Sequence, residues 1–386
     1  MPTPSAALRA ADSAMQPVGR LRHPEAPKTP SSAQPTIHAL TGLRAVAAVW
    51  VVLFHYRADV LQLVPALQPL EPVLRAGYLG VDVFFVLSGF VLAYNYAGRL
   101  GRWVPREAWT FVRNRVARVW PVHVATLHLD LLLAWAIGAL GVTAGGHLRT
   151  VPTYLTNLTM THQWFTDRTS FNAPAWSISA EWAAYLACPI LLLGLARVRR
   201  AATAALLAGL CYAAMLGVFV LWARPDGNVP HAGLLRVAAE FTAGVLLLRV
   251  HQRMPRRVGA LALPWAIGIL AAVQLVPAAT RGYWLAPAFA VLTLLFAAPD
   301  GLLGRLLARR SFTYWGETSY CLYMSHLLML PVLHRVIDPA VAGSAAWWVG
   351  LLVLLGYAGA LAGAAVTLRR LVEVPARRLL RAPTPA

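Results

Sequence analysis

Long apolar stretches, separated by short segments rich in arginine, dominate the chain from residue 39 onward. Ten of them come close to the roughly 20 residues that an α-helix needs to cross a bilayer. They cover residues 39–57, 78–97, 120–141, 181–196, 202–222, 233–250, 258–277, 283–299, 319–336 and 346–368. This pattern predicts an all-α fold, a polytopic membrane helix bundle with about ten transmembrane helices.

The parts of the chain outside these stretches suggest how it is divided. Residues 1–38 are rich in Pro, Ala and Ser, which is typical of a disordered tail. Residues 39–380 form the predicted transmembrane domain, and residues 381–386 form a short C-terminal tail. The longest connection, residues 142–180, carries Trp164, Phe165 and Trp176 and is expected to fold back against the bundle.

The composition supports a lipid bilayer as the main partner. Hydrophobic residues make up 58% and charged residues 13% of the 386 residues, whereas soluble domains have roughly 45–50% and about 25%. The net charge of +19 raises the question of nucleic acid. The basic residues lie between apolar stretches instead of on one soluble face, so we expect no nucleic-acid partner.

The distribution of Lys and Arg predicts the orientation of the helices. If the N-terminus is inside, the inside segments hold 26 of the 34 basic residues and the outside segments hold seven. The remaining residue, Arg236, lies within a predicted helix. Because cytoplasmic loops of membrane proteins carry the excess of Lys and Arg, both termini are predicted to be cytoplasmic.

Ionisable residues within the apolar stretches are candidates for function because they are costly in hydrocarbon. His55 is either satisfied by an interhelical hydrogen bond or acts as a general base. Arg44 precedes His55 by eleven residues, or three helical turns, so the two lie on the same helix face about 16 Å apart. Asp82 could orient the histidine or face its imidazolium. Glu181 is either the structural partner of an arginine or an active-site carboxylate.

Arg115 and Arg118 are three residues apart and lie on one helical face. They either anchor the helix at the cytoplasmic surface or form a clamp for the phosphates of a nucleotide-type donor. The spacing of Arg236 and Glu240 favours a structural pair between them. Glu373 is expected to pair with the arginines near it in the sequence.

Several hydroxyl and aromatic side chains complete the set of candidates. Ser177 lies four residues before Glu181, and Trp176 precedes it. Ser88 and Gly89 favour close helix packing. Ser319, Tyr323 and His326 form a polar stripe that must face protein or a cavity. The sequence has no run of metal ligands, so neither a metal nor a permanently bound cofactor is expected.

Seven motifs follow one another in an order that resembles the acyltransferase 3 family of integral-membrane O-acyltransferases. The resemblance covers roughly residues 39–380. The motifs are Leu43-Arg44-Ala45 through Phe54-His55-Tyr56; Gly80-Val81-Asp82-Val83-Phe84-Phe85-Val86-Leu87-Ser88-Gly89-Phe90; Arg115-x-x-Arg118-Val119-x-Pro121; Trp176-Ser177-x-x-x-Glu181-Trp182; Arg236-x-x-x-Glu240-Phe241-x-x-Gly244; Ser319-Tyr320-x-Leu322-Tyr323-x-x-His326; and Glu373-x-Pro375.

The resemblance implies transfer of a short acyl group, usually acetyl, from acyl-CoA to a hydroxyl in the bacterial cytoplasmic membrane. It implies that His55 is essential, that Arg115 and Arg118 engage the CoA donor, and that Glu181 is the family's carboxylate. The implied acceptor is a carbohydrate such as a cell-surface polysaccharide. A macrolide antibiotic or its sugar is the alternative acceptor, and a transporter of a lipid-linked sugar or acyl group ranks lower.

Overall fold

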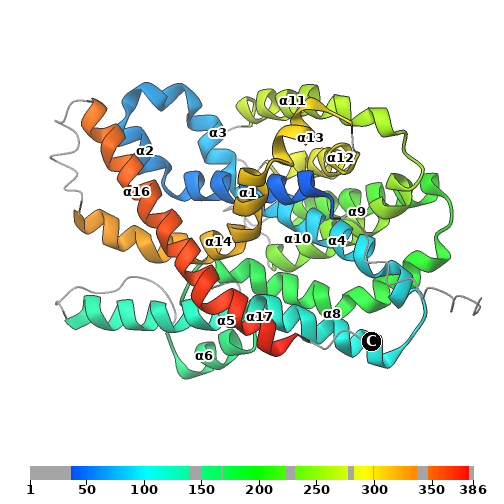
Figure 1. Cartoon of the computed structure of the whole chain (residues 1–386), viewed down its shortest axis with the longest axis horizontal. Helices are drawn as coiled ribbons and strands as arrows, with labels where there is room; N and C mark the ends of the chain where they lie inside the picture. Colours follow the sequence, from blue (N-terminus) through cyan, green and yellow to red (C-terminus); the bar gives the residue numbers. More distant parts are fainter. Residues whose placement is uncertain are drawn as a thin grey trace, which may run out of the picture. The chain divides into compact units, whose positions relative to one another are not determined.

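The structure is a computed structural model that describes residues 36–139, 149–166, 168–222, 231–276, 282–298, 300–336 and 347–381. All regular elements within these ranges are helical, which confirms the all-α prediction (Figure 1). Nearly all of the predicted N-terminal tail, residues 1–38, lies outside the described residues, and so do residues 382–386. The division into tails and a transmembrane domain therefore stays a prediction.

Each of the ten predicted stretches overlaps one helix of the structure. The ten helices are α1 (His38–His55), α4 (Gly80–Leu100), α5 (Pro105–Ala139), α8 (Ala175–Arg197), α9 (Ala201–Trp222), α10 (Ala232–His251), α11 (Ala262–Gln274), α12 (Ala286–Ala297), α14 (Arg310–Val336) and α16 (Trp347–Leu368).

Shorter helical elements connect these ten. They are α2 (Arg57–Leu63), η1 (Pro65–Leu70), α3 (Glu71–Arg75), η2 (Ala76–Leu79), α6 (Val151–Leu158), α7 (His162–Phe165), η3 (Arg256–Leu261), η4 (Tyr283–Leu285), α13 (Leu302–Leu307), the π-helical turn η5 (Arg369–Glu373) and α17 (Val374–Leu380).

Seven helical segments in the described part of the chain are long and apolar enough to cross a bilayer. They confirm a polytopic all-α membrane protein. Helices α10, α12 and α14 are not among the seven. Helix α12 is too short, with only 12 residues. Helix α10 carries the charged residues Arg236 and Glu240 in its middle. The count of ten and the cytoplasmic termini stay predictions.

Helix α5 differs from its predicted bounds. It begins at Pro105 instead of residue 120. Its first half carries Arg113, Arg115 and Arg118. A segment with so many charges is not recognised as an apolar stretch. A charged half and an apolar half therefore form one continuous helix of 35 residues.

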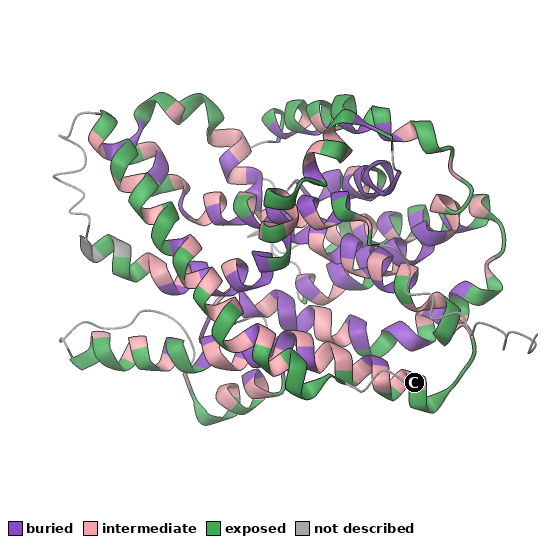
Figure 2. Cartoon of the chain, in the orientation of Figure 1, coloured by how far each residue is buried: buried purple, intermediate pink, exposed green. Residues whose placement is uncertain are grey.

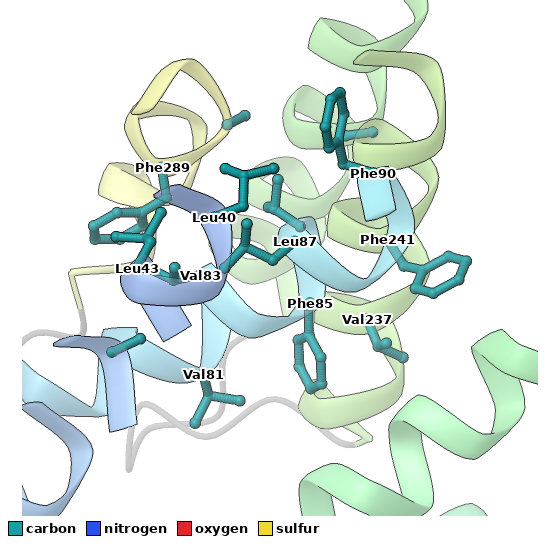
Figure 3. Packing of buried hydrophobic residues seen from close by; sticks show 14 of the residues in the cluster. Leu40, Leu43, Val81, Val83, Phe85, Leu87, Phe90, Val237, Phe241 and Phe289 are labelled. Atoms are coloured by element: carbon teal, nitrogen blue, oxygen red, sulfur yellow. The ribbon is translucent and has the colours of Figure 1, made fainter. Parts of the chain in front are cut away.

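The core of the bundle is built on α4 and α10. Buried residues gather along both helices (Figure 2). In Figure 3, Leu40 and Leu43 of α1, Phe241 of α10 and Phe289 of α12 gather around α4. At Gly89 of α4 a side chain would collide with the carbonyl of Phe241, so this glycine lets the two helices cross closely. The predicted packing role of Gly89 is thus confirmed.

The connection between α5 and α8 folds back against these helices, as predicted. The indole Nε1 of Trp120 on α5 donates to the carbonyl of Leu158 on α6, at 3.0 Å. The indole of Trp164 on α7 donates to the carbonyl of Ser179 on α8, at 2.9 Å. Trp176 lies within the first turn of α8 itself.

Candidate active site

A small cavity, which we call the arginine cavity, lies between α1, α4, α5, α8 and α14 and has a volume of about 130 Å³. It gathers most of the site residues that the sequence singled out. Its polar lining comprises Arg44, Ser88, Arg115, Arg118, Ser177, Glu181, Tyr185, Ser319, Tyr320 and Tyr323. Three cationic side chains and one carboxylate thus face the same small volume, although they come from three helices.

Arg115 is held by aromatic rings. Its guanidinium carbon lies 5.9 Å from each of the ring centres of Tyr96, Phe111 and Tyr185. Its Nε is buried and has no hydrogen-bond partner among the described residues. A guanidinium that is oriented by rings and keeps a free donor is suited to bind an anion.

Arg118 has a different environment, because it forms an ion pair with the buried carboxylate of Glu373. The Cys321 thiol also donates to Glu373, at 3.1 Å, and Arg377 lies 3.6 Å from the same carboxylate. Glu373 therefore pairs with its sequence neighbour Arg377 as expected, but also with Arg118 from α5. The two predicted donor-binding arginines are chemically distinct.

A second, larger cavity of about 520 Å³ lies at the other end of α1. We call it the histidine cavity, since His55 lines it. Its other polar residues are Arg57, Arg75, Tyr78, Thr169, Trp176, Arg236, Tyr283 and Tyr323. Arg57, Arg75 and Tyr78 were not predicted as site residues, because the two arginines were counted only as outside charges and Tyr78 only as the start of an apolar stretch.

His55 contacts a second histidine in this region. Its Nδ1 lies 2.9 Å from the carbonyl oxygen of Val51 and 3.2 Å from Nε2 of His326 on α14. Nδ1 of His326 lies 2.6 Å from the carbonyl oxygen of Tyr323. A carbonyl oxygen only accepts, so the Nδ1 atom of each ring is assigned the proton.

This assignment fixes the state of both rings. Nε2 of His326 is then an acceptor, which suits its contact with the N–H of His55. Nε2 of His55 is left unprotonated, on a ring that lines the histidine cavity. A neutral imidazole in this tautomer can remove a proton from a hydroxyl.

The sequence suggested that Asp82 orients His55, but in the structure Asp82 pairs with another residue. Its two carboxylate oxygens accept hydrogen bonds from Nε and Nη2 of Arg236, at 3.1 and 2.6 Å. The rings of Trp176 and Tyr283 lie over the same guanidinium, at 5.4 and 4.6 Å. Both charges are buried, and such burial requires a paired geometry of this kind. Asp82 therefore holds Arg236 in the cavity wall.

The predicted pair between Arg236 and Glu240 is wrong for the same reason. Arg236 directs two of its three guanidinium nitrogens, Nε and Nη2, toward Asp82. Both carboxylate oxygens of Glu240 are buried and lack a hydrogen-bond partner in the described ranges. Sequence spacing favoured the neighbour on the same helix, whereas packing of α10 against α4 brings a better partner.

The two cavities meet at one wall. Val81 of α4 and Tyr323 of α14 line both of them. The Tyr323 hydroxyl lies 2.8 Å from Oγ of Ser177 and donates to the carbonyl of Pro174 at 3.2 Å. Helix α1 passes alongside, with Arg44 in one cavity and His55 in the other. The predicted polar stripe of Ser319, Tyr323 and His326 is buried, as expected.

Comparison with known proteins agrees with this architecture. The family model Acyl_transf_3, described as an acyltransferase domain, matches residues 37–369. The acyltransferase MdmB of Streptomyces mycarofaciens is 27% identical over 373 residues, which cover 89% of this chain and 92% of that protein.

A second relative is longer than this chain. The putative peptidoglycan O-acetyltransferase YrhL of Bacillus subtilis (strain 168) is 25% identical over 322 residues, 75% of this chain and 48% of that protein. No solved structure matched the chain. Since the family model spans most of the sequence, the chain belongs to the acyltransferase 3 family, as its motifs predicted.

Proposed function

We propose that the protein is a membrane O-acyltransferase of the bacterial cytoplasmic membrane. It would move a short acyl group, most simply acetyl, from acyl-CoA to a hydroxyl of a carbohydrate such as a cell-surface polysaccharide. The observation that carries the proposal is the wall of Val81 and Tyr323, which joins a cavity rich in arginine to a cavity that contains His55. Family membership supports acyl transfer as the reaction.

The arginine cavity suits the donor. CoA is a polyanion, and forked guanidinium groups bind its phosphates well. Arg115 has a buried donor to offer, and Arg44 lies in the same cavity. The orientation predicted from the basic residues would place this cavity toward the cytoplasm, which is where acyl-CoA occurs. Arg118 would contribute charge while it stays paired with Glu373.

The histidine cavity suits the acceptor. In the proposed reaction, Nε2 of His55 takes the proton of the acceptor hydroxyl, and the oxygen attacks the thioester carbonyl carbon. The new C–O bond forms as the C–S bond breaks, and the CoA thiolate receives the proton back from His55. The Val51 carbonyl and His326 together would keep His55 in the required tautomer. Glu181 lies in the arginine cavity, so it would act on the donor side.

The acceptor class has one alternative, a macrolide antibiotic or its sugar. The name of the Bacillus relative favours a carbohydrate. The histidine cavity, with a volume of about 520 Å³, has room for a sugar ring. A transporter of a lipid-linked sugar or acyl group is the lower-ranked reading, and it would need no base at His55.

The test is transfer of label from radioactive acetyl-CoA in membranes, offered a panel of glycan and macrolide acceptors. Wild type should label one acceptor class, and His55→Ala should not. His128→Ala is the matched control, because His128 is exposed on α5 and lies outside both cavities. Full transfer by correctly inserted His55→Ala would overturn the base assignment. Wild-type protein that neither transfers label nor binds CoA would favour the transporter.

A further inference from the structure

The wall between the two cavities offers a way to choose among acyl groups. An acyl-CoA that enters through the arginine cavity carries its acyl group in front of the sulfur atom. The acyl group must therefore pass Val81 and Tyr323 before the thioester carbonyl comes near the acceptor at His55. This argument rests on the proposed function and concerns which donor that function uses.

The side chains of the wall are firmly held. Tyr323 is 6% exposed, and its hydroxyl is tied to Ser177 and Pro174. The ring of Phe84 meets the Tyr323 ring edge to face, with 6.2 Å between ring centres. These contacts from α4 and α8 leave the tyrosine little freedom to swing aside.

Val81 is equally fixed by its helix. It is 5% exposed, and its position on α4 can be followed in Figure 3. The preceding residue, Gly80, packs against α1 so closely that an added Cβ would lie 2.7 Å from the Ala47 carbonyl oxygen. Helix α4 thus has no room to shift toward α1. A branched side chain on a fixed backbone has little freedom to rotate away from its position in the wall.

The cavity before the wall is also small. The arginine cavity has about 130 Å³, against about 520 Å³ behind the wall. Bulk close to the thioester therefore meets resistance on the donor side, whereas the acceptor side is spacious. Protein interiors are close-packed, so a single extra methyl group at such a point is felt.

We propose that Val81 and Tyr323 set the acyl-group specificity by excluding donors that are branched next to the thioester carbonyl. Unbranched short groups pass, and branched groups of the same composition do not. The discrimination per carbon group in such a pocket is about tenfold or more. Neither the family assignment nor the names of the relatives states this preference.

The test compares two isomers, butyryl-CoA and isobutyryl-CoA, with acetyl-CoA as reference. Release of the CoA thiol is measured with each donor in the presence of the acceptor panel, and kcat/KM is taken for each. Wild type should favour butyryl over isobutyryl by about tenfold or more. Val81→Ala should lower that ratio by about tenfold, because it removes the branch that faces the donor.

Two further variants keep the test decisive. Tyr323→Phe removes the hydroxyl that holds the ring, so it should lower the ratio in the same direction even if Val81→Ala fails to insert. Val83→Ala is the matched control, since Val83 is a buried valine on the same helix and lines neither of the two cavities. Its ratio should equal that of wild type.

Three results would count against the proposal. An unchanged ratio in active Val81→Ala and Tyr323→Phe would overturn it and leave the proposed function intact. An equal change in Val83→Ala would show that loosened packing of α4, and not the wall, changes the selection of the donor. No thiol release by wild type from any of the three donors would contradict the proposed function itself.

Discussion

His55 and His326 lie side by side, with 3.2 Å between Nδ1 of the first and Nε2 of the second, although 271 residues separate them. The two rings differ in their surroundings and therefore in the roles that we assign to them. His326 is fully buried and fixed by the Tyr323 carbonyl, and the Tyr56 hydroxyl donates to the backbone carbonyl of His326 at 2.5 Å. His55 lines the cavity. We therefore treat His326 as a positioning residue and His55 as the base.

Replacing His326 should lower kcat and leave the donor KM nearly unchanged. His326→Ala removes one of the two acceptors of the His55 Nδ1–H group and leaves the Val51 carbonyl, so kcat should fall, but by less than the factor of about 10²–10⁴ expected for loss of the base itself. His326→Gln offers an oxygen acceptor and should recover part of the rate. Steady-state kinetics of both variants checks this. A normal kcat in correctly folded His326→Ala would contradict the positioning role.

Arg115 and Arg118 should respond differently to substitution. Arg115→Ala removes a free, buried donor, so the donor KM should rise about tenfold or more while stability stays close to that of wild type. Arg118→Ala leaves Glu373 buried without its α5 partner, which costs about 3–5 kcal/mol. Donor kinetics and thermal unfolding in detergent separate the two effects.

The control for Arg118 is the double replacement Arg118→Leu with Glu373→Leu. It removes both charges at once, so stability should return toward wild type while donor binding does not. If Arg118→Ala is as stable as wild type and only the donor KM rises, the ion pair with Glu373 does not stabilise the fold. Both arginines are then donor ligands.

Asp82 should matter for stability. Asp82→Ala leaves Arg236 as an unpaired buried cation, and the expected loss is about 3–5 kcal/mol. Chemical or thermal unfolding of the purified protein measures it, with Asp59→Ala as a comparison at a more exposed ion pair. A stable Asp82→Ala variant with reduced kcat would instead support the original idea that Asp82 assists His55.

The crossing of α4 and α10 should not tolerate a larger residue. Gly89→Ala would place its methyl group against the Phe241 carbonyl, and such overpacking costs about 1–3 kcal/mol. Gly217→Ala on α9 is the matched control, because an added methyl there meets nothing within 4 Å. It should be neutral or slightly stabilising. Equal thermal stability of the two variants would refute the close crossing.

Acid should destabilise the segment that folds back on α5 and α8. Burial lowers the pKa of His162 on α7 to about 3, and the ring of His123 stacks parallel to it at 6.1 Å. The unfolded histidine binds its proton near pH 6.5. The unfolded state thus gains protons first, and stability is lost as pH falls from about 6.5 toward 3. His162→Gln should show a weaker loss of thermal stability between pH 7 and pH 4.5.

The apolar pattern was enough to locate the helices, because the bilayer demands long apolar segments whatever they pack against. It missed the first half of α5, because the arginines there interrupt the apolar pattern. The motifs singled out Arg44, Arg115, Arg118 and Glu181, and the structure brings these four residues to one cavity, although the sequence reading grouped Glu181 with His55. Their roles in the reaction stay predictions.

Partners across helices were beyond the sequence. The carboxylate of Asp82 is 154 residues from Arg236, whereas Glu240 is only four residues away. Spacing along one helix therefore favoured the wrong partner. The shared wall at Val81 and Tyr323 likewise depends on how α4 packs near α14, and no local pattern encodes it.

The proposed function requires that a donor in the arginine cavity meets an acceptor in the histidine cavity across the bilayer. The most direct measurement offers labelled acetyl-CoA, which does not cross membranes, to sealed vesicles of opposite orientation that contain the protein and its acceptor. This function predicts transfer in inside-out vesicles, loss of that transfer in His55→Ala, and no transfer in right-side-out vesicles. Equal transfer in both orientations would contradict it.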